Sequence, residues 1–468
     1  MLLIALSSLA LFSCVCGENP AVQLALTDKG LQAVRHFAAG VIQEKLEQVE
    51  LPKVEGRIMG IHYTLSGMKI TQYDFPEPEV HFSPFVSGLV LSLSGLNVAL
   101  TGDWATHLGA IDDDGTFNLA LFDLSLRSQL GLDKDTTGRP SVSSLYCEAE
   151  IQQVDVQFSG GASWVFQWLV NIFQDHIRSR IQKEICPCVE DAIQSLEQHL
   201  QAINVSVEVN PVMSLELPLS APPDVHDDSI NFGLKGEFYS LESHTDPPFV
   251  APPFSLPIQT EYMLSMGVSE YSANSASFAY YISGHLQALV NDSMIPSFSP
   301  IRLNTRSMGR FIPQLQQKFP DLLMVLQVYA RQTPLFSFEP GFVKLDLLSA
   351  IKAFVVQSNS TLTPVFKLHA DSALSGKMWL DGKKVLSTLK MDNFSLSLAS
   401  SEIGPFKTAA LEGLAKMGVS KALDMINKKL AQGFDLPHTT NAQLVNSVLS
   451  LEKGFMAFFS DAKFHSTL

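Results

Sequence analysis

The sequence predicts an α+β protein built from two similar lobes that a proline-rich linker joins. Residues 218–257 hold eight of the 25 prolines and divide the chain into halves of similar length. Proline fixes φ and lacks an N–H donor, so this density indicates an extended connector. Both halves carry long amphipathic helices and alternating strands, and 468 residues suit two domains of about 200 residues each.

The chain begins with an uncharged apolar run, MLLIALSSLALFSCVCG, at residues 1–17. The run is too short for a membrane-spanning helix and ends in small residues, so we expect a cleaved secretory signal peptide. A buried N-terminal strand is the alternative interpretation. The expected organisation is then an N-terminal lobe at 18–217, the linker at 218–257 and a C-terminal lobe at 258–468.

The amino-acid composition and net charge limit the classes of ligand and macromolecule that the protein is expected to bind. Hydrophobic residues make up 46% of the chain and charged residues 17%, so the surplus apolar surface lies in cores or is offered to an apolar ligand. The net charge of −15 argues against capture of nucleic acid and against a broadly cationic antibacterial protein.

Two long helices are expected in the N-terminal lobe. The first begins after Thr27, a suitable N-cap, and ends before Pro52; its apolar face comprises Leu31, Val34, Ala38, Val41, Ile42 and Val49. The second begins near Trp164, and we expect Pro187 to kink or restart it. Its apolar positions are Val165, Leu169, Ile172, Phe173, Ile177, Ile181 and Ile185, followed after the proline by Val189, Ile193 and Leu196.

The C-terminal lobe repeats this plan. A weaker helix is expected over residues 311–330, broken by Pro320. A stronger helix ends before Gly433 and Pro437, and its apolar positions are Leu411, Leu414, Ala415, Ala422, Met425, Ile426 and Leu430.

Alternating apolar and polar residues predict antiparallel strands between the paired helices. Asp114–Gly115 is expected to form a hairpin turn. A helix against a curved sheet can leave an apolar slot, although ordinary core is the alternative for these stripes. The clearest strand patterns occupy residues 89–95, 96–102, 117–126 and 394–400.

Three cysteines follow the expected signal peptide: Cys147, Cys186 and Cys188. In an oxidising compartment we expect two of them to form a structural disulfide and one to remain free. The sequons predict N-glycosylation in a secreted protein, at Asn204, Asn291, Asn359 and Asn393.

Catalytic and metal-binding motifs are missing from the sequence. It has no G-x-S-x-G nucleophile elbow, no HExxH and no phosphate-binding G-x-x-x-x-G-K-[ST] loop. The acidic triplet at residues 112–114 lacks the spacing of a calcium loop. We therefore expect a non-enzymatic protein with no catalytic residue, no metal site and no cofactor.

Several segments, in order and spacing, resemble the family of bactericidal/permeability-increasing protein and lipopolysaccharide-binding protein, within a wider group that includes plasma lipid transfer proteins. The resemblance spans the whole mature chain. It is carried by NPAVQLALTDKGL at 19–31, LKGEFYS at 234–240, DPPFVAPP at 246–253, residues 291–296, KFPDL at 318–322, IGPF at 403–406 and NKKLAQGFDLP at 427–437.

The resemblance implies an elongated boomerang of two similar barrel lobes, joined by a central sheet to which the linker contributes strands. Matching Trp164 and Gln167 to the family's second helix places Cys186 at its disulfide position, with Cys147 as partner and Cys188 as the extra thiol. It also implies one bound phospholipid per lobe. Candidate pocket residues are Leu31, Val34, Val41, Leu169, Phe173, Ile177, Leu414 and Ile426.

The tip of the N-terminal lobe departs from the family pattern. Endotoxin-binding members carry Lys and Arg there, which suit lipid A phosphates. This chain retains Lys53 and Arg57 but has no Lys or Arg between Trp104 and Leu126. Acidic and neutral residues stand in their place, namely Glu47, Gln48, Glu50, His107 and residues 112–114.

The resemblance implies a secreted, monomeric innate-immunity protein that recognises lipopolysaccharide of Gram-negative bacteria and phospholipid through apolar pockets. The bacterial outer-membrane surface is an expected partner and antibacterial activity a further expectation; nucleic acid is not. The alternative is an extracellular carrier of phospholipid or sterol ester without preference for endotoxin.

Overall fold

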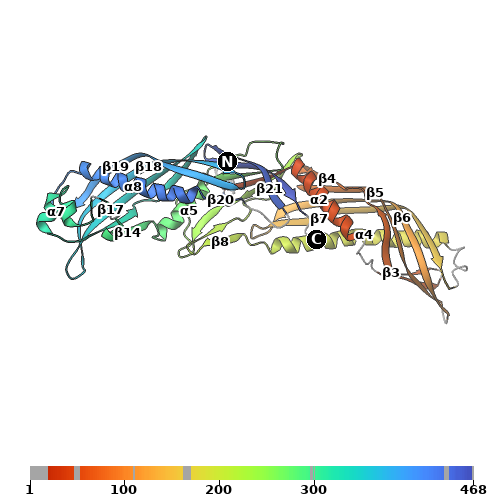
Figure 1. Ribbon diagram of the computed structural model, residues 1–468. Helices are drawn as coiled ribbons and strands as arrows, with labels where there is room; N and C mark the ends of the chain where they lie inside the picture. The colour runs from red at the N-terminus through yellow and green to blue at the C-terminus, as the bar shows by residue number, and fades with distance from the viewer. Residues whose placement is uncertain are drawn as a thin grey trace, which may run out of the picture.

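The protein is an elongated α+β molecule with a curved lobe at each end (Figure 1). The computed structural model describes residues 19–46, 53–58, 60–108, 111–161, 170–295, 299, 301–436 and 442–465. Antiparallel strands dominate and helices are few, which confirms the predicted fold class. The expected signal peptide and the matching residues Trp164 and Gln167 lie outside the described residues.

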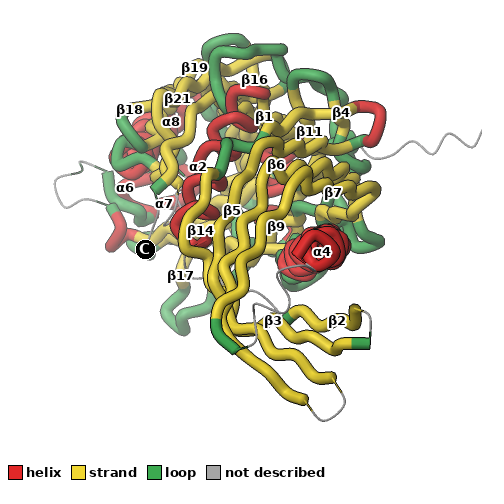
Figure 2. The backbone as a smooth tube through the Cα atoms, turned by 90° about the vertical axis from the view of Figure 1, so that its right-hand side faces the viewer, coloured by secondary structure: helices red, strands yellow, loops and turns green. Residues whose placement is uncertain are grey.

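The N-terminal lobe is a curved antiparallel sheet with the order β2-β3-β5-β6-β7, and β4 pairs with β5. Figure 2 shows α4 end-on beside this sheet. The helices are α2 (Asp28–Leu46), η1 (Pro84–Val86) and α4 (Val170–Gln201). The strands are β2 (Val54–Ile58), β3 (Ile61–Asp74), β4 (Glu79–Ser83), β5 (Gly88–Leu108), β6 (Ile111–Lys134) and β7 (Pro140–Ser159).

The C-terminal lobe is a second antiparallel sheet with the order β14-β15-β17-β18-β19-β20, and β16 pairs with β17. Its strands are β14 (Gln287–Asn291), β15 (Met324–Ala330), β16 (Leu335–Glu339), β17 (Phe342–Val356), β18 (Leu362–Asp381), β19 (Lys384–Ser401) and β20 (Phe434–Asp435). Its helices are α5 (Glu270–Ile282), η3 (Asp292–Met294), α6 (Thr305–Met308), α7 (Pro313–Lys318) and α8 (Ala409–Leu430).

A central sheet combines strands from distant parts of the chain in the order β10-β11-β1-β13-β22-β21. A smaller sheet beside it has the order β12-β9-β8. The central strands are β1 (Val22–Thr27), β10 (Asp224–Val225), β11 (Ser229–Leu234), β13 (Leu264–Ser269), β21 (Ala442–Glu452) and β22 (Phe455–Phe464). The smaller sheet contains β8 (Ser206–Asn210), β9 (Met213–Glu216) and β12 (Glu237–Ser240).

The linker segment contributes β10, β11 and β12, and no helix or strand is assigned between Ser240 and Leu264. This agrees with an extended, proline-rich connector. The lobe and linker boundaries at 18–217, 218–257 and 258–468 stay a prediction.

The expected hairpin turn at Asp114–Gly115 is wrong. Both residues lie within β6, where Gly115 pairs with Trp104 and Asp114 with Ala105. Gly115 is needed for packing instead, because a Cβ atom there would lie 2.7 Å from Nε1 of Trp104 and 2.2 Å from the carbonyl oxygen of Ser159. The indole N–H of Trp104 donates to that carbonyl at 3.1 Å.

The expected weak helix over residues 311–330 is also largely wrong. Only α7 (Pro313–Lys318) is helical, and Met324–Ala330 forms strand β15. Asp321, which follows Pro320, has a φ of 53°, which ends any helical path there. Beyond it the valines of MVLQVYA suit a strand paired with β17.

Two further expectations need correction. The helix α4 continues through the exposed Pro187 as one element, so it does not restart there, while a kink at this residue stays a prediction. The patterns at 89–95 and 96–102 belong to one strand, β5, whose register shifts between Leu93 and Val98. Gly95, with a φ of 79°, lies at this irregularity.

Candidate lipid-binding site

The core of the N-terminal lobe lies between α4 and the curved sheet. Ile177 on α4 is fully buried there, and Ile181 and Ile185 pack against the same cluster one and two turns later. This spacing places one apolar stripe of α4 on the sheet. The buried sheet residues of the cluster include Leu65, Leu100, Trp104, Phe117, Leu119, Ile151 and Val156.

The core of the C-terminal lobe is formed by α6, α7, α8 and the sheet. Leu411 on α8 is buried in this cluster, and Leu414, Ala415 and Val419 are partly buried against it. Of the predicted apolar positions of α8, Leu411, Leu414 and Ala415 therefore pack on the lobe. Ala422, Met425 and Ile426 are instead exposed. Buried partners from other elements include Leu303, Ile312, Leu315, Met324, Val355, Val365, Phe366 and Phe394.

The predicted pocket residues do not form one continuous set. Leu31 is buried with Phe82, Val225 and Ile230, in a cluster near the central sheet, separate from the one that contains Ile177. Leu414 is partly buried against the C-terminal core. Val34 and Ile426 are 40% and 43% exposed. Leu169 lies outside the described residues, as do the side chains of Val41 and Phe173.

A shallow cavity of about 270 Å³ lies at the start of β14, against β15 and the end of α5. Two tyrosines, Tyr281 and Tyr329, line it together with Gln287, Gln327 and Lys352. This mixed lining differs from the apolar slot expected for acyl chains. Sequence patterns do not predict the cavity, because its lining comes from three separate strands and one helix.

The tip of the N-terminal lobe carries little free positive charge among the residues described. The ammonium group of Lys53 lies 2.6 Å from the carboxylate of Glu55, and this hydrogen bond lowers the pKa of Glu55. Strand register then places Arg57 opposite His62, and His62 opposite His107. His107 in turn contacts Asp112 on β6. At the tip, basic side chains therefore lie beside acidic ones, in the pairs Lys53–Glu55 and His107–Asp112.

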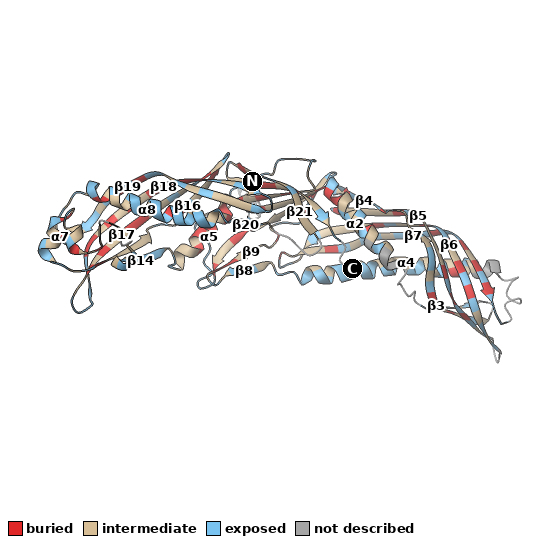
Figure 3. Cartoon of the chain, in the orientation of Figure 1, coloured by how far each residue is buried: buried red, intermediate tan, exposed pale blue. Residues whose placement is uncertain are grey.

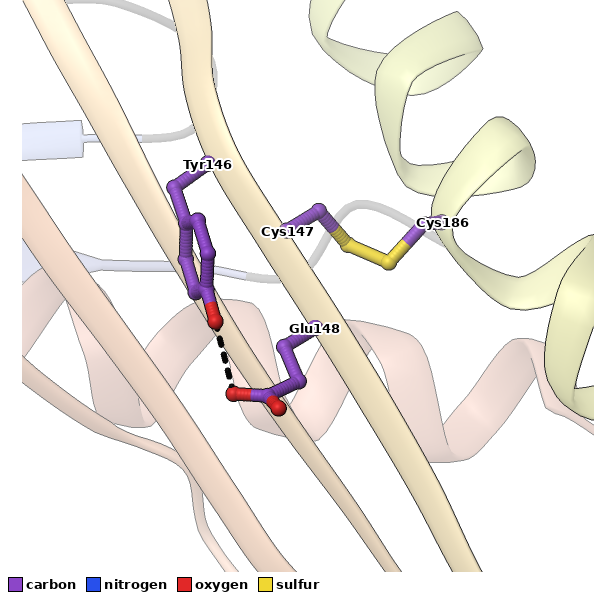
Figure 4. Close-up of a disulfide and its surroundings, with 4 residues drawn as sticks. All are labelled: Tyr146, Cys147, Glu148 and Cys186. Atoms are coloured by element: carbon purple, nitrogen blue, oxygen red, sulfur yellow. Dashed lines mark hydrogen bonds between the residues drawn. A yellow bond between two sulfur atoms is a disulfide. The ribbon is translucent and has the colours of Figure 1, made fainter.

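The disulfide joins β7 to α4 through Cys147 and Cys186 (Figure 4). This is the pairing that the family resemblance implies. Cys188, two residues further along α4, is free and exposed. Beside the disulfide, the hydroxyl of Tyr146 donates to Glu148 at 2.8 Å. The disulfide fixes α4 to the sheet near the middle of the helix.

All four sequon asparagines have exposed side chains. Asn204 lies between α4 and β8, Asn291 ends β14, and Asn359 lies in the turn between β17 and β18. Asn393 lies within β19, opposite Ala373. Glycosylation at these positions stays a prediction.

Within the described part of the chain, no group of His, Cys, Asp and Glu side chains is arranged to hold a metal ion. None of the helices described is both long and apolar enough to cross a membrane.

Comparison with known proteins covers both halves of the chain. Residues 30–200 match the N-terminal domain, and residues 207–464 the C-terminal domain, of the LBP / BPI / CETP family. The chain is 34% identical to the bactericidal permeability-increasing protein of Sebastes schlegelii, covering 98% of each protein. It is 28% identical to the lipopolysaccharide-binding protein of Bos taurus, covering 96% of this chain and 94% of that protein.

A solved structure has the same arrangement. The crystal structure of lipopolysaccharide binding protein aligns with a TM-score of 0.57 and 25% identity, over 95% of this chain and 99% of that one. The family consists of lipid-binding proteins that are not enzymes, in agreement with the prediction from the sequence. The matches to both domain profiles and the 34% identity over nearly the whole length show that the chain belongs to the LBP / BPI / CETP family.

Proposed function

We propose that the protein is a secreted, monomeric innate-immunity protein that binds lipopolysaccharide of Gram-negative bacteria and phospholipid. The observation that carries this proposal is the full-length similarity to proteins named for lipopolysaccharide binding and for bactericidal activity. A role at the bacterial outer-membrane surface, with antibacterial activity, follows from the same similarity.

Acyl-chain burial supplies the affinity in this proposal. Removing a CH₂ group from water contributes about 0.8 kcal/mol, so two acyl chains can be held without any catalytic or metal-binding group. We place one phospholipid in each lobe, beneath the helices that pack on the curved sheets. The candidate lining residues remain Leu31, Val34, Val41, Leu169, Phe173, Ile177, Leu414 and Ile426.

Secretion is supported by features of different kinds. The N-terminal apolar run resembles a signal peptide, and the Cys147–Cys186 disulfide suits an oxidising compartment. The exposed sequon asparagines are accessible to glycosylation.

The test uses the full chain expressed through a secretory pathway. Native extraction and mass spectrometry should find about one phospholipid per lobe, as two hydrophobic cores with covering helices lead us to expect. Titration with purified lipid A at physiological salt should give saturable binding. Undetectable lipid A binding would contradict endotoxin recognition, and lipid-free protein would contradict the acyl pockets.

A second candidate is a carrier of phospholipid or sterol ester without endotoxin preference. The pairing of Lys53 with Glu55 favours it, since it leaves the N-terminal tip with little free charge for lipid A phosphates. This carrier would move labelled phospholipid between vesicles at the same rate with and without lipid A. Strong competition by lipid A would favour the first candidate instead.

A further inference from the structure

The outward side of α8 alternates methionine and lysine. Met417, Lys421, Met425 and Lys428 are spaced by four, four and three residues, so they share one face of the helix. Met417 is 62% exposed and Met425 59% exposed. Figure 3 shows α8 mostly pale blue along its length. Leu411 and Leu423 are the buried residues of this helix and pack on the lobe.

The C-terminal end of α8 is fixed beside the hairpin formed by β18 and β19. Asn427 exchanges two hydrogen bonds of 2.8 Å with the backbone of Leu389 on β19. After the helix, Phe434 pairs with Val385 in the sheet. This hairpin adds Trp379, which is 40% exposed, and Phe434 itself is 65% exposed.

Positive charge gathers on the same two segments. Residues 377–390 and 416–435 contain eight lysines and three aspartates, a net charge of +5 in a chain whose total is −15. Lys384 lies 3.7 Å from Asp435, and Lys390 lies 3.1 Å from Asp392. Among the residues that the structure describes, the other lysines of these segments form no ion pair.

We call Met417, Lys421, Met425, Lys428, Lys429, Trp379 and Phe434 the α8 surface, and we propose that it docks on an anionic lipid surface. Helices that lie in a membrane interface combine large apolar side chains with lysines whose charges reach the headgroups. Charge complementarity selects anionic lipid over an apolar protein partner. At physiological salt the Debye length is about 8 Å, so the distant acidic residues are screened while lysines at the contact are not.

This inference rests on the proposed lipid-binding function. It adds to the lipid held inside each lobe a contact between the α8 surface and the lipid surface that supplies this lipid. It differs from the N-terminal tip, where the sequence shows little positive charge. The cationic contact therefore lies on the C-terminal lobe of this chain.

The test measures binding of the full chain to vesicles of phosphatidylglycerol and phosphatidylcholine, and to phosphatidylcholine alone. A lysine near an anionic surface is worth about fivefold in binding, so K421Q/K428Q/K429Q should bind the anionic vesicles about 100-fold more weakly. The matched control, K69Q/K183Q/K453Q, removes the same charge from exposed lysines elsewhere and should bind like the parent protein. M417S/M425S should also weaken binding.

Equal losses in both triple variants, or unchanged binding of K421Q/K428Q/K429Q, would overturn the proposal. So would a parent protein that ignores anionic vesicles. Extraction of co-purified lipid from every variant separates the two hypotheses. Lipid retained by variants that no longer dock supports the α8 surface, whereas a parent protein without lipid contradicts the proposed function itself.

Discussion

The ammonium group of Lys235 lies 2.7 Å from the carboxylate of Glu216 and ties the central sheet to the smaller one. Lys235 follows β11, and Glu216 ends β9. A second carboxylate, that of Glu237, lies 3.1 Å from the same ammonium group and accepts a hydrogen bond from Tyr271 on α5. Burial opposes the charge on Lys235, but hydrogen bonds to the two glutamates outweigh it and raise the pKa of Lys235.

We expect Lys235→Met to lower the free energy of unfolding by about 2 kcal/mol, because it leaves two partly or fully buried carboxylates without their cation. Equilibrium denaturation at pH 7 measures the loss. Because the folded-state pKa is raised, this contribution is complete below the unfolded pKa near 10.5 and declines only in more alkaline solution. Lys344→Met, at the more exposed pair with Glu339, is the control and should cost less than about 1 kcal/mol. Equal effects would contradict the role of Lys235.

The disulfide should be needed for stability and the third thiol should not. Cys147 and Cys186 are 39 residues apart, and closing such a loop stabilises a fold by about 4 kcal/mol in the chain-entropy model. Cys147→Ala should therefore reduce the secreted yield and the melting temperature. Cys188→Ala, at an exposed free thiol, should leave both unchanged. The reverse result would show that the wrong thiols are paired.

Ile177 and Ile426 allow core and pocket roles to be compared. Ile177→Ala should lower the free energy of unfolding by about 3 kcal/mol, since it removes a fully buried side chain from the N-terminal core. Ile426→Ala, at a half-exposed position on α8, should cost less than about 1 kcal/mol. Denaturation and lipid extraction are measured together. Loss of bound lipid without loss of stability in Ile177→Ala would contradict the core role and leave only the proposed pocket role of this residue.

Asp292 should make the protein sensitive to acid. It accepts a hydrogen bond of 2.6 Å from Arg302 and one of 2.7 Å from the backbone N–H of Leu303, and the bond from Arg302 is the main reason that its pKa is lowered. Because the folded-state pKa of Asp292 is lowered, its ionised carboxylate stabilises the fold at pH values above the unfolded-state pKa, near 4. This stabilisation is lost as the pH falls through the folded-state pKa.

Asp292→Asn should therefore cost about 1 kcal/mol at pH 7 and progressively less below pH 4, because the parent protein then loses the same interaction. Asp292 is the middle residue of the Asn291 sequon, and asparagine there keeps the sequon intact. Urea denaturation across pH 3–7 gives the comparison. Asp74→Asn, at an exposed carboxylate on β3, is the control; a penalty for Asp292→Asn that grows in acid would refute this account.

The sequence predicted the long helices and the two-lobe plan because their signals are local. Periodicity and the Gly433 terminus define α8 closely. In contrast, α5 was missed since its buried side chains include Ser272 and Ser275, which carry no apolar pattern. Ser269 followed by Glu270 was the available signal, as an N-cap and an acidic first turn.

The candidate site was less predictable because it depends on distant contacts. Leu31 and Ile177 have the same kind of helical spacing, yet they are buried in two separate clusters. Leu31 lies with Val225 and Ile230 of the central sheet, whereas Ile177 lies among strands of the N-terminal lobe. The α8 surface likewise needs the β18–β19 hairpin, which lies some 40 residues before it and is fixed by Asn427. Gly236 in LKGEFYS, with a φ of 64°, lies against Val22, so this motif serves packing at the centre.

The position of β1 bears on what happens if the chain is cut. This strand lies between β11 and β13, and β13 continues the sheet to β22. Proteolysis between Ser240 and Leu264 would sever the backbone but leave every one of these ladders intact. The two fragments should stay together on a sizing column until denaturant separates them, so a nicked protein would still behave as a whole molecule.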